Sequence, residues 1–168
     1  MGIATTIRRF LDTHGVPYDI VPHPYTNTSY GSAKAAHVSA DRVAKGVLLK
    51  KDDDYLLAVV PASRKLDLSW LIIEVEHDLE LAGEDELAEI FFDCAYGAVP
   101  AVGPAYGLDT LVENCLRAQP ELYFEAGDHE ELVHIKELDY ETLLGNVRYL
   151  SFTHFPDAAE ARVRPVFD

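Results

Sequence analysis

Hydrophobic and polar positions alternate along the chain in short blocks, each bounded by glycine, proline or acidic residues. Near the N-terminus, Ile3, Ile7, Phe10 and Leu11 fall on one face of a helix, and Gly15 is the residue expected to end it. Helical spacing and cap residues predict further short helices at residues 32–40, from residue 67, at 84–92 and at 139–144. Short β-like segments are interleaved with these helices, which implies a sheet with the helices at its periphery.

Period-two alternation predicts that sheet. Its clearest element is a hairpin in which "RVAKGVLLKK" and "YLLAVVP" are joined by three acidic residues at positions 52–54. Further strands are predicted in "PYDIVPH", "DTLVEN", "ELYFEAG" and "ELVHIKEL". Strands and helices alternate without a regular βαβ rhythm, which predicts an α+β fold with a mixed sheet or barrel and peripheral helices. The polar segment "PYTNTSYG" is expected to form a loop beside a pocket.

The chain length predicts one compact domain. At 168 residues the chain can bury a substantial core, and we assign residues 1–150 to one domain and residues 151–168, where the pattern weakens, to a C-terminal tail. No apolar run reaches the roughly 18 residues of a membrane helix, and the N-terminus lacks the apolar core of a signal peptide. We therefore expect a cytoplasmic protein with no membrane partner.

Charge and cysteine content exclude several classes of function. A net charge of −15 disfavours tight, sequence-independent binding to a nucleic-acid backbone, so DNA is not expected as a partner. The two cysteines, Cys94 and Cys115, form no CxxC motif and are interpreted as small core residues. Contacts with phosphate, if there are any, must be local.

Lys45 is the first candidate for chemistry. It stands in the apolar run "VAKGVLLK", where a lysine either points outward from a half-buried strand or points into a pocket. In a pocket its ammonium is a compact cation that holds a phosphate or a carbonyl oxygen. The local pattern leaves both directions open.

A loop rich in glycine and proline, "GAVPAVGPAYG", is the second candidate. Glycine allows a ligand to approach the backbone closely, and proline fixes φ, so the loop is able to present N–H groups in a rigid array suited to an oxyanion. The alternative is a structural crossover between a helix and a strand. The loop matches no nucleotide-phosphate motif.

His129 and His134 are the third candidate. Two histidines across a turn and a strand are a weak metal signal, and a solvated turn histidine beside a strand histidine is the simpler interpretation. No metal site and no cofactor is predicted. No GxSxG motif or Ser-His-Asp order indicates a covalent nucleophile, so hydrolysis would use a positioned water.

In their order and spacing, six segments resemble a known family: "VPHP", "VAKGVLLK", "YLLAVVPASRKLDLSWL", "LAGEDELAEIF", "GAVPAVG" and "FEAGDHEELVHI". The chain is similar, from about residue 18 to 144, to the YbaK-like aminoacyl-tRNA deacylases. This family includes free-standing editing proteins and the editing domain inserted in bacterial prolyl-tRNA synthetases. The resemblance implies a mixed, mostly antiparallel β-barrel of six to seven strands surrounded by short helices.

The resemblance also implies an activity, the metal-independent hydrolysis of the ester that joins a wrong amino acid to the 3′ end of transfer RNA. The expected substrate carries a small amino acid such as Ala, Cys or Ser, on tRNA for proline, and a synthetase is a possible partner. The implied catalytic residues are Lys45, Gly97, Ala98, Val99 and Pro100. The implied substrate-binding residues are His23, Tyr30, Gly46, Gly103, Gly127, His129 and His134.

Two features depart from the family pattern. Gly46 follows the lysine where relatives often carry Thr or Ser, which removes a hydroxyl from the expected pocket. The acidic surface should repel transfer RNA, although half of the 14 basic residues lie in the segment 34–65. We therefore expect contact to be confined to the acceptor end, with weak, strongly salt-dependent binding.

These departures leave an alternative function open. The domain either edits mischarged transfer RNA or has become a catalytically weak binding or regulatory module for an aminoacyl-nucleotide or a partner protein. The lysine and the intact "GAVP" loop favour the enzyme, whereas Gly46 and the acidic surface favour the module. A metal-dependent hydrolase has little support, since no ligand set is complete.

Overall fold

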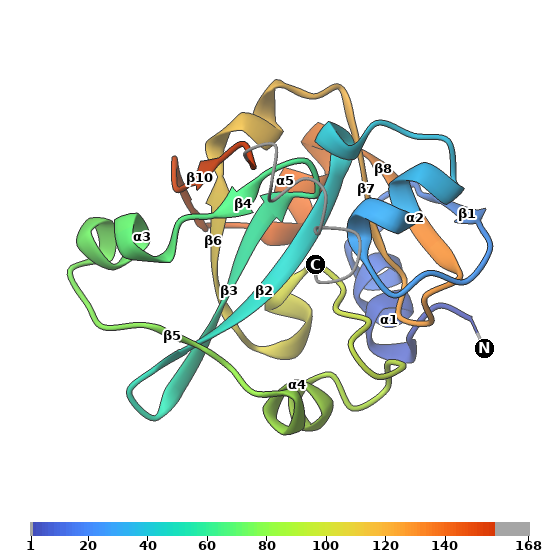
Figure 1. Cartoon of the computed structure of the whole chain (residues 1–168). Coiled ribbons are helices and arrows are strands. Elements are labelled where there is room, and N and C mark those ends of the chain that lie inside the picture. The colour runs from blue at the N-terminus through green and yellow to red at the C-terminus, as the bar shows by residue number, and fades with distance from the viewer. Residues whose placement is uncertain (1, 157–168) are drawn as a thin grey trace.

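A long hairpin of two strands, β2 (Val43–Lys51) and β3 (Asp54–Pro61), forms the centre of the computed structural model, which describes residues 2–156 (Figure 1). The remaining strands are β1 (Asp19–Pro22), β4 (Lys65–Leu66), β5 (Glu80–Leu81), β6 (Asp109–Glu113), β7 (Glu121–Glu125), β8 (Glu131–Lys136), β9 (Arg148–Leu150) and β10 (Thr153–His154). The α-helices are α1 (Thr5–His14), α2 (Ser29–Ala35), α3 (Leu68–Val75), α4 (Glu84–Ile90) and α5 (Glu137–Leu144). Three short 3₁₀ helices are η1 (Ala40–Arg42), η2 (Gly103–Tyr106) and η3 (Asn114–Ala118).

The hairpin is buried on both faces, which explains its nearly continuous apolar sequence. Leu57 and Val59 belong to the larger core, whereas Ala58 and Val60, which alternate with them along β3, belong to a second core. A strand covered on both faces is expected to lack polar positions. Truncation of fully buried Leu57 to Ala is expected to cost about 2–5 kcal/mol of stability.

The strands form one mixed sheet in the order β1-β8-β7-β2-β3-β6-β9, with β5 paired to β2 off this path. Pairing is antiparallel for β1–β8, β8–β7 and β2–β3, and parallel for β7–β2, β3–β6 and β6–β9. The predicted mixed α+β class is confirmed. The predicted closure into a barrel is not found among residues 2–156, because the order ends at β1 and β9 without a pairing between them.

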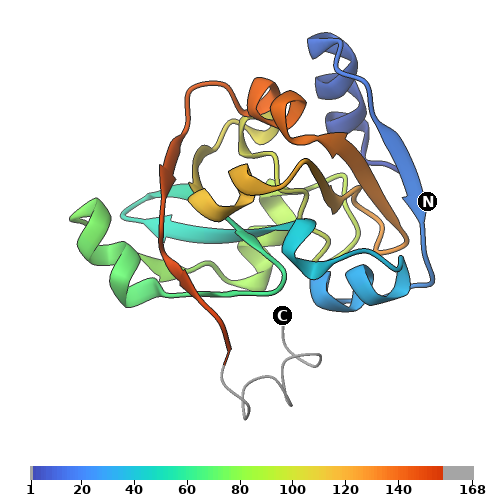
Figure 2. The ribbon, with the colours of Figure 1, turned by 90° about the horizontal axis from the view of Figure 1, so that it is seen from above.

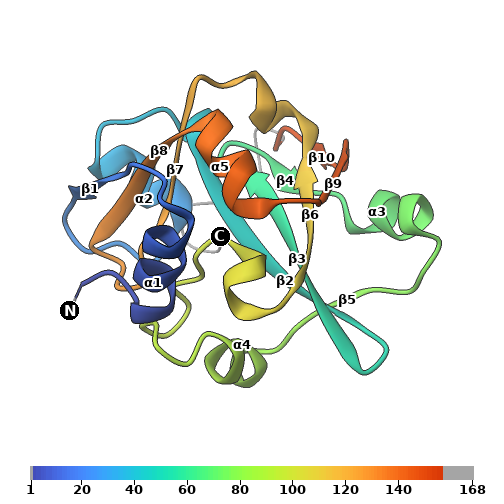
Figure 3. The same cartoon turned by 180° about the vertical axis from the view of Figure 1, so that it is seen from behind.

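Helices cover the sheet unequally. Seen from behind, α1, α5 and η2 lie together over one face, where they contact one another and enclose the larger core (Figure 3). Helix α2 contacts β2, and its Ala33 packs with Val43 and Tyr123 in a third small core. Helix α4 lies apart, beside the open edge of β2 where the candidate site is found.

Most predicted element boundaries agree with the structure. Helix α1 ends at Gly15, whose φ of 64° is left-handed, and Asp67 caps α3 by accepting a hydrogen bond from the Trp70 N–H at 3.0 Å. Helix α2 begins at residue 29, three residues before the predicted start. Thr28 takes the cap position because its hydroxyl accepts the Gly31 N–H at 2.9 Å, which is the usual role of threonine at a helix start.

The segment after α5 runs along the end of the sheet opposite α1 (Figure 2). In it Phe152 is buried and β10 pairs with β4. Glu113 anchors this segment by accepting the N–H groups of Phe152 and Thr153. The rest of the predicted tail, residues 157–168, lies outside the described residues. Among residues 2–156, every helix is too short or too polar to cross a bilayer.

Candidate functional site

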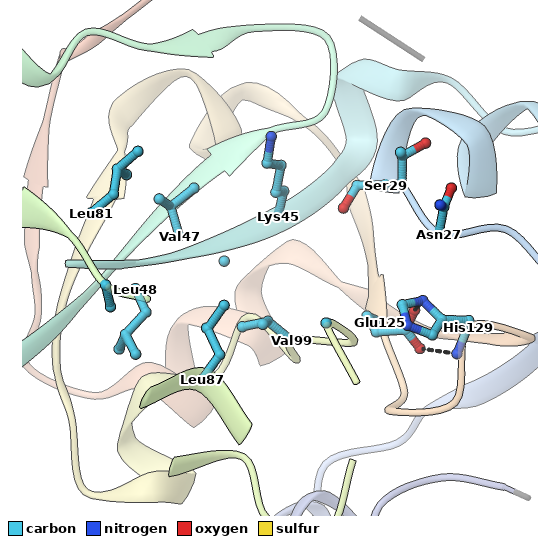
Figure 4. A pocket seen from close by; sticks show the side chains of 14 residues that line it. Asn27, Ser29, Lys45, Val47, Leu48, Leu81, Leu87, Val99, Glu125 and His129 are labelled. Atoms are coloured by element: carbon cyan, nitrogen blue, oxygen red, sulfur yellow. Dashed lines mark hydrogen bonds and ion pairs between the residues drawn. The ribbon is translucent and has the colours of Figure 1, made fainter. Parts of the chain in front are cut away.

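A pocket of about 220 Å³ opens along one edge of β2. On that edge β7 pairs only with residues 43–44 and β5 only with residues 49–50, so the stretch between them has no strand neighbour among the described residues. The walls come from β2, the loop before α2, the loop after α4 and the β7–β8 turn (Figure 4). The lining residues are Asn27, Thr28, Ser29, Lys45, Gly46, Val47, Leu48, Leu81, Ala82, Leu87, Gly97, Val99, Glu125 and His129.

Lys45 is half-buried and is one of the residues that line this pocket. Figure 4 shows Lys45 and Val47 on one side of β2 and Leu48 on the other, as expected for alternating strand residues. Lys50, further along the strand, forms an ion pair with Glu86 at 3.3 Å. The Lys45 side chain therefore leaves β2 on the face opposite Leu48, at the edge of the strand that borders the pocket.

Gly46 is in contact distance of the facing loop. A Cβ at this position would lie 3.0 Å from Val99 Cγ1 and 3.2 Å from Leu57 Cδ1. The carbonyl of Leu48 accepts the Ala82 N–H at this edge of β2, and alternate residues direct their backbone groups to the same edge. The N–H and C=O of Gly46 therefore point into the gap, and the missing side chain leaves room for Val99 to approach them.

The loop after α4 provides the opposite wall. Gly97 adopts a positive φ of 77°, and the following N–H, of Ala98, turns back to the Ala95 carbonyl at 2.9 Å. Gly97 and Val99 line the pocket, whereas Ala98 and Pro100, the other two predicted catalytic positions, are buried behind it. Within the described residues, the N–H groups of Gly97 and Val99 donate to no backbone acceptor.

His129 fixes the position of that loop. Its Nε2 contacts the carbonyl oxygen of Tyr96 at 2.6 Å, and since a carbonyl only accepts, Nε2 carries the proton. The N–H of Ala95 donates to the Gly127 carbonyl at 2.7 Å, so two hydrogen bonds join the loop to the β7–β8 turn. His129 is only 5 % exposed, and its backbone has a left-handed φ of 65°.

Glu125 holds the β7–β8 turn in shape. Its Oε2 accepts the N–H groups of Gly127, Asp128 and His129 at 2.8–3.2 Å, and its Oε1 lies 3.9 Å from His129 Nδ1. Glu125 was not among the residues predicted from the sequence, although "EAGDH" is a turn signal.

The polar loop of Asn27, Thr28 and Ser29 was predicted to lie beside a pocket, and these three residues do line it.

Helix α4 is anchored beside the pocket by one carboxylate. Glu86 accepts hydrogen bonds from the Tyr55 hydroxyl at 2.6 Å and the Gly83 N–H at 2.7 Å, and together with Lys50 these donors lower the pKa of Glu86 to about 2. The charge-assisted contacts hold α4 against β2 and β3. Leu87, the next residue, is thereby placed in the pocket wall.

Two predicted substrate-binding glycines have structural positions outside the pocket lining. A Cβ on Gly103 would lie 1.9 Å from Thr110 Oγ1, so any other residue there would force the Thr110 side chain to move. Gly127 has a φ of 126°, and a Cβ there would lie 3.0 Å from that of Ala4. Both glycines support the walls of the pocket without facing it.

The remaining predicted residues are also outside the lining. His23 is buried, and its Nδ1 donates to the Pro24 carbonyl at 2.7 Å. Tyr30 is half-buried on α2. His134 stacks on Tyr123, with ring centroids 4.6 Å apart, and its Nε2 lies 3.1 Å from Glu121 Oε1. The structure therefore brings together Lys45, Gly46, Gly97, Val99 and His129, but not His23, Tyr30, Gly103, Gly127 or His134.

The side chains that line the pocket are poor in metal-ligating groups. Across residues 2–156, no cluster of three or more His, Cys, Asp or Glu side chains is arranged to hold a metal ion. The pocket combines one cation, unpaired backbone donors and apolar walls. These groups can hold an anionic ligand and stabilise negative charge that develops on an oxygen atom.

Comparison with solved structures shows the fold. The chain is similar to a candidate trans-editing enzyme for prolyl tRNA synthetase, with 23% identity, a TM-score of 0.77, and coverage of 89% of this chain and 95% of the other. It is also similar to a scaffold protein used in the computational design of grafted epitopes, with 21% identity, a TM-score of 0.77 and coverage of 92% and 100%. A third similar structure is a candidate signal transduction protein from Marinobacter aquaeolei VT8, with 17% identity and a TM-score of 0.72. The match covers 88% of this chain but only 30% of that longer one.

Comparison with sequence families identifies the chain. A search of curated proteins gave no significant match. The model of the aminoacyl-tRNA editing domain matches residues 23–143, a range that includes every residue lining the pocket. The resemblance to YbaK-like deacylases inferred from the sequence segments is thereby confirmed. This chain belongs to the aminoacyl-tRNA editing domain family.

Proposed function

We propose that the protein is a trans-editing hydrolase that removes a wrongly attached small amino acid from the 3′ end of transfer RNA. One observation carries the proposal: Lys45 on β2 and the Gly97 and Val99 backbone lie on opposite walls of a single pocket in a chain of the editing family. A cation and N–H donors are the groups that an aminoacyl ester with a neighbouring phosphate requires.

In the proposed reaction, water adds to the ester carbonyl and the bond from that carbon to the ribose oxygen breaks. The products are the free amino acid and a transfer RNA with its terminal hydroxyl restored. Lys45 holds the phosphate of the terminal nucleotide, and the N–H groups of Gly97 and Val99 stabilise the oxyanion of the tetrahedral intermediate. An oxyanion-hole donor is worth about 3–4 kcal/mol of transition-state stabilisation. The ribose hydroxyl of the substrate helps to position the water.

Selectivity follows from the size of the pocket. A volume of about 220 Å³ that also holds part of the ribose leaves space for a small side chain only. Leu87, Val99 and Leu48 exclude a larger side chain sterically, whereas rejection of a smaller one yields only about 1–3 kcal/mol for each methylene. Ala, Cys and Ser are therefore the expected substrates, on transfer RNA for proline, either alone or with a synthetase partner in the cytoplasm.

The test is a deacylation assay in the presence of a chelator, on transfer RNA for proline charged with Ala, Cys, Ser or Pro. We expect the unmodified protein to hydrolyse at least one of the small-residue esters and to spare the Pro ester. Lys45→Ala should lower kcat/KM at least about a hundredfold, because it removes a charged contact to the phosphate of the substrate. Lys51→Ala is the matched control, because Lys51 is an exposed lysine at the end of the same strand and outside the pocket lining.

Gly46 favours a second candidate, a binding module that has lost turnover. The position carries no hydroxyl, and its backbone faces the pocket. In that case the folded protein hydrolyses none of the four esters, yet a non-hydrolysable analogue of aminoacyl-adenosine 5′-phosphate still raises its melting temperature, and Lys45→Ala abolishes this effect. Hydrolysis of any ester that depends on Lys45 excludes the module.

A further inference from the structure

Tyr25 is an exposed aromatic residue whose backbone is held rigidly. Its side chain is 64 % exposed, although its neighbours in the chain are fixed on both sides. The N–H of His23 donates to the Glu130 carbonyl at 2.8 Å, and the N–H of Thr26 donates to the His129 carbonyl at 3.2 Å. The ring of His23 also donates to the carbonyl of Pro24 at 2.7 Å, which fixes the peptide group that leads into Tyr25.

The ring of Tyr25 lies at the rim of the pocket. Its centroid is 5.3 Å from that of His129 in an edge-on arrangement, and His129 is part of the pocket lining. Two residues further along the chain, Asn27 begins the stretch that lines another side of the same pocket. The Tyr25 ring thus contacts a buried residue, while most of the side chain is exposed.

Because the protein is strongly acidic, an exposed aromatic ring would help it to bind a nucleic-acid strand. With a net charge of −15, the surface offers few phosphate contacts, so a nucleic-acid strand must gain affinity in another way. Base stacking on an aromatic ring is independent of charge and tolerates any base. A ring on a backbone that is already held in place loses less conformational entropy when a base stacks on it.

We propose that Tyr25 is a stacking platform for the nucleotide that precedes the terminal one at a single-stranded RNA end. This inference rests on the proposed function, since it assumes that the terminal nucleotide and its ester occupy the pocket. The RNA strand then leaves the pocket past His129, and its next base stacks on the exposed face of the Tyr25 ring. The ligand class is a single-stranded 3′ end of at least two nucleotides.

The experiment compares two ester substrates that differ only beyond the terminal nucleotide. One is an RNA minihelix ending in CCA and charged with the amino acid that the protein removes. The other is the 3′-aminoacyl ester of adenosine 5′-phosphate, which keeps the terminal nucleotide but has no neighbouring base. The variants are Tyr25→Leu, which keeps apolar bulk without an aromatic face, and Tyr25→Phe, which keeps the ring. Phe155→Ala is a control at another exposed aromatic residue, outside the pocket lining.

We expect Tyr25→Leu to lower kcat/KM on the minihelix about tenfold, chiefly through KM, and to leave hydrolysis of the mononucleotide ester unchanged. Tyr25→Phe and Phe155→Ala should behave like the unmodified protein on both substrates. An equal loss on both substrates would mean that Tyr25 supports the pocket itself, and no loss on either would mean that no base stacks there. Both results overturn the inference while the proposed function stands. If the unmodified protein hydrolyses neither ester, both the inference and the proposed function are overturned.

Discussion

His129 and His134 are five positions apart in one turn-and-strand segment, yet they differ in backbone conformation and in the groups that they contact. His129 is at a positive φ, is 5 % exposed, lines the pocket and donates to the glycine-rich loop. His134 is on β8, directly across from Asp19 on one side and Tyr123 on the other, and it contacts both of these residues as well as Glu121. The difference shows that backbone conformation decides which histidine reaches the site. The turn aims His129 at the loop, whereas the strand register commits His134 to cross-strand packing.

The largest expected effect in this comparison is the removal of the His129 donor. His129→Ala should lower kcat/KM by about ten- to a hundredfold, because the Tyr96 carbonyl loses its hydrogen bond to the ring and the loop that carries Gly97 shifts. His129→Gln is the matched variant: both substitutions place a residue of ordinary φ preference in the left-handed region, but Gln keeps an N–H donor. The measurement is steady-state deacylation with kcat and KM resolved. Equal activity of Ala and Gln variants would show that the hydrogen bond to Tyr96 plays no part.

The next effect concerns the contact between Gly46 and the loop. Gly46→Ser places a Cβ 3.0 Å from Val99 Cγ1, so Val99 must move by a few tenths of an ångström and the pocket wall moves with it. We expect a several-fold change in kcat/KM and a loss of about 1–3 kcal/mol in unfolding free energy, the usual cost of overpacking. Urea denaturation measures the second quantity. Adding Val99→Ala should recover part of the stability if the two side chains clash, and simple additivity would contradict the contact.

The residues of the site show what could be predicted from the sequence. Apolar periodicity and turn residues correctly predicted the hairpin that carries Lys45 and the helix cap at Asp67, because both are local signals. The direction of Lys45 was left open. Whether this part of β2 borders a pocket depends on where β5 and β7 stop pairing with it, and those pairings are long-range.

The same limit applies to the other positions. The structure gives steric reasons for the glycines at 103 and 127, and their assignment to substrate binding through the resemblance stays a prediction. Glu125 went unpredicted because a glutamate at the end of a strand carries no local mark of its role. Only the folded turn brings three N–H groups to its carboxylate. The start of α2 was displaced because Thr28 and Ser32 are both good cap residues, and the helix uses the earlier one.

A smaller effect is expected at His134. His134→Ala removes a half-buried ring that stacks on Tyr123, a residue of the third small core, and that is a partner of Glu121. We expect a loss of about 1 kcal/mol in unfolding free energy, the upper range for a cross-strand pair, and no change in kcat/KM on the minihelix, because His134 is outside the pocket lining. Urea denaturation and the deacylation assay are run on the same preparation. A large loss of activity without a loss of stability would place His134 in the site and remove the contrast with His129.

The smallest effect is a pH dependence of the same cluster. The Tyr123 hydroxyl donates to Glu121 Oε1 at 2.9 Å, and this hydrogen bond, with the nearby His134, lowers the pKa of Glu121 below its ordinary value. A carboxyl whose pKa is lowered by folding stabilises the protein above its unfolded pKa of about 4.3, and this contribution is lost as the pH falls through the folded pKa. Glu121→Gln should therefore be less stable than the unmodified protein at pH 6, and the difference should shrink steadily below pH 4.5. Urea midpoints measured from pH 6 to pH 3 check this, with Glu130→Gln as the control at a glutamate on the β7–β8 turn. Because the carboxylate is close to solvent, high salt should reduce the difference at pH 6. A difference that does not vary with pH would mean that Glu121 acts through packing and not through its charge.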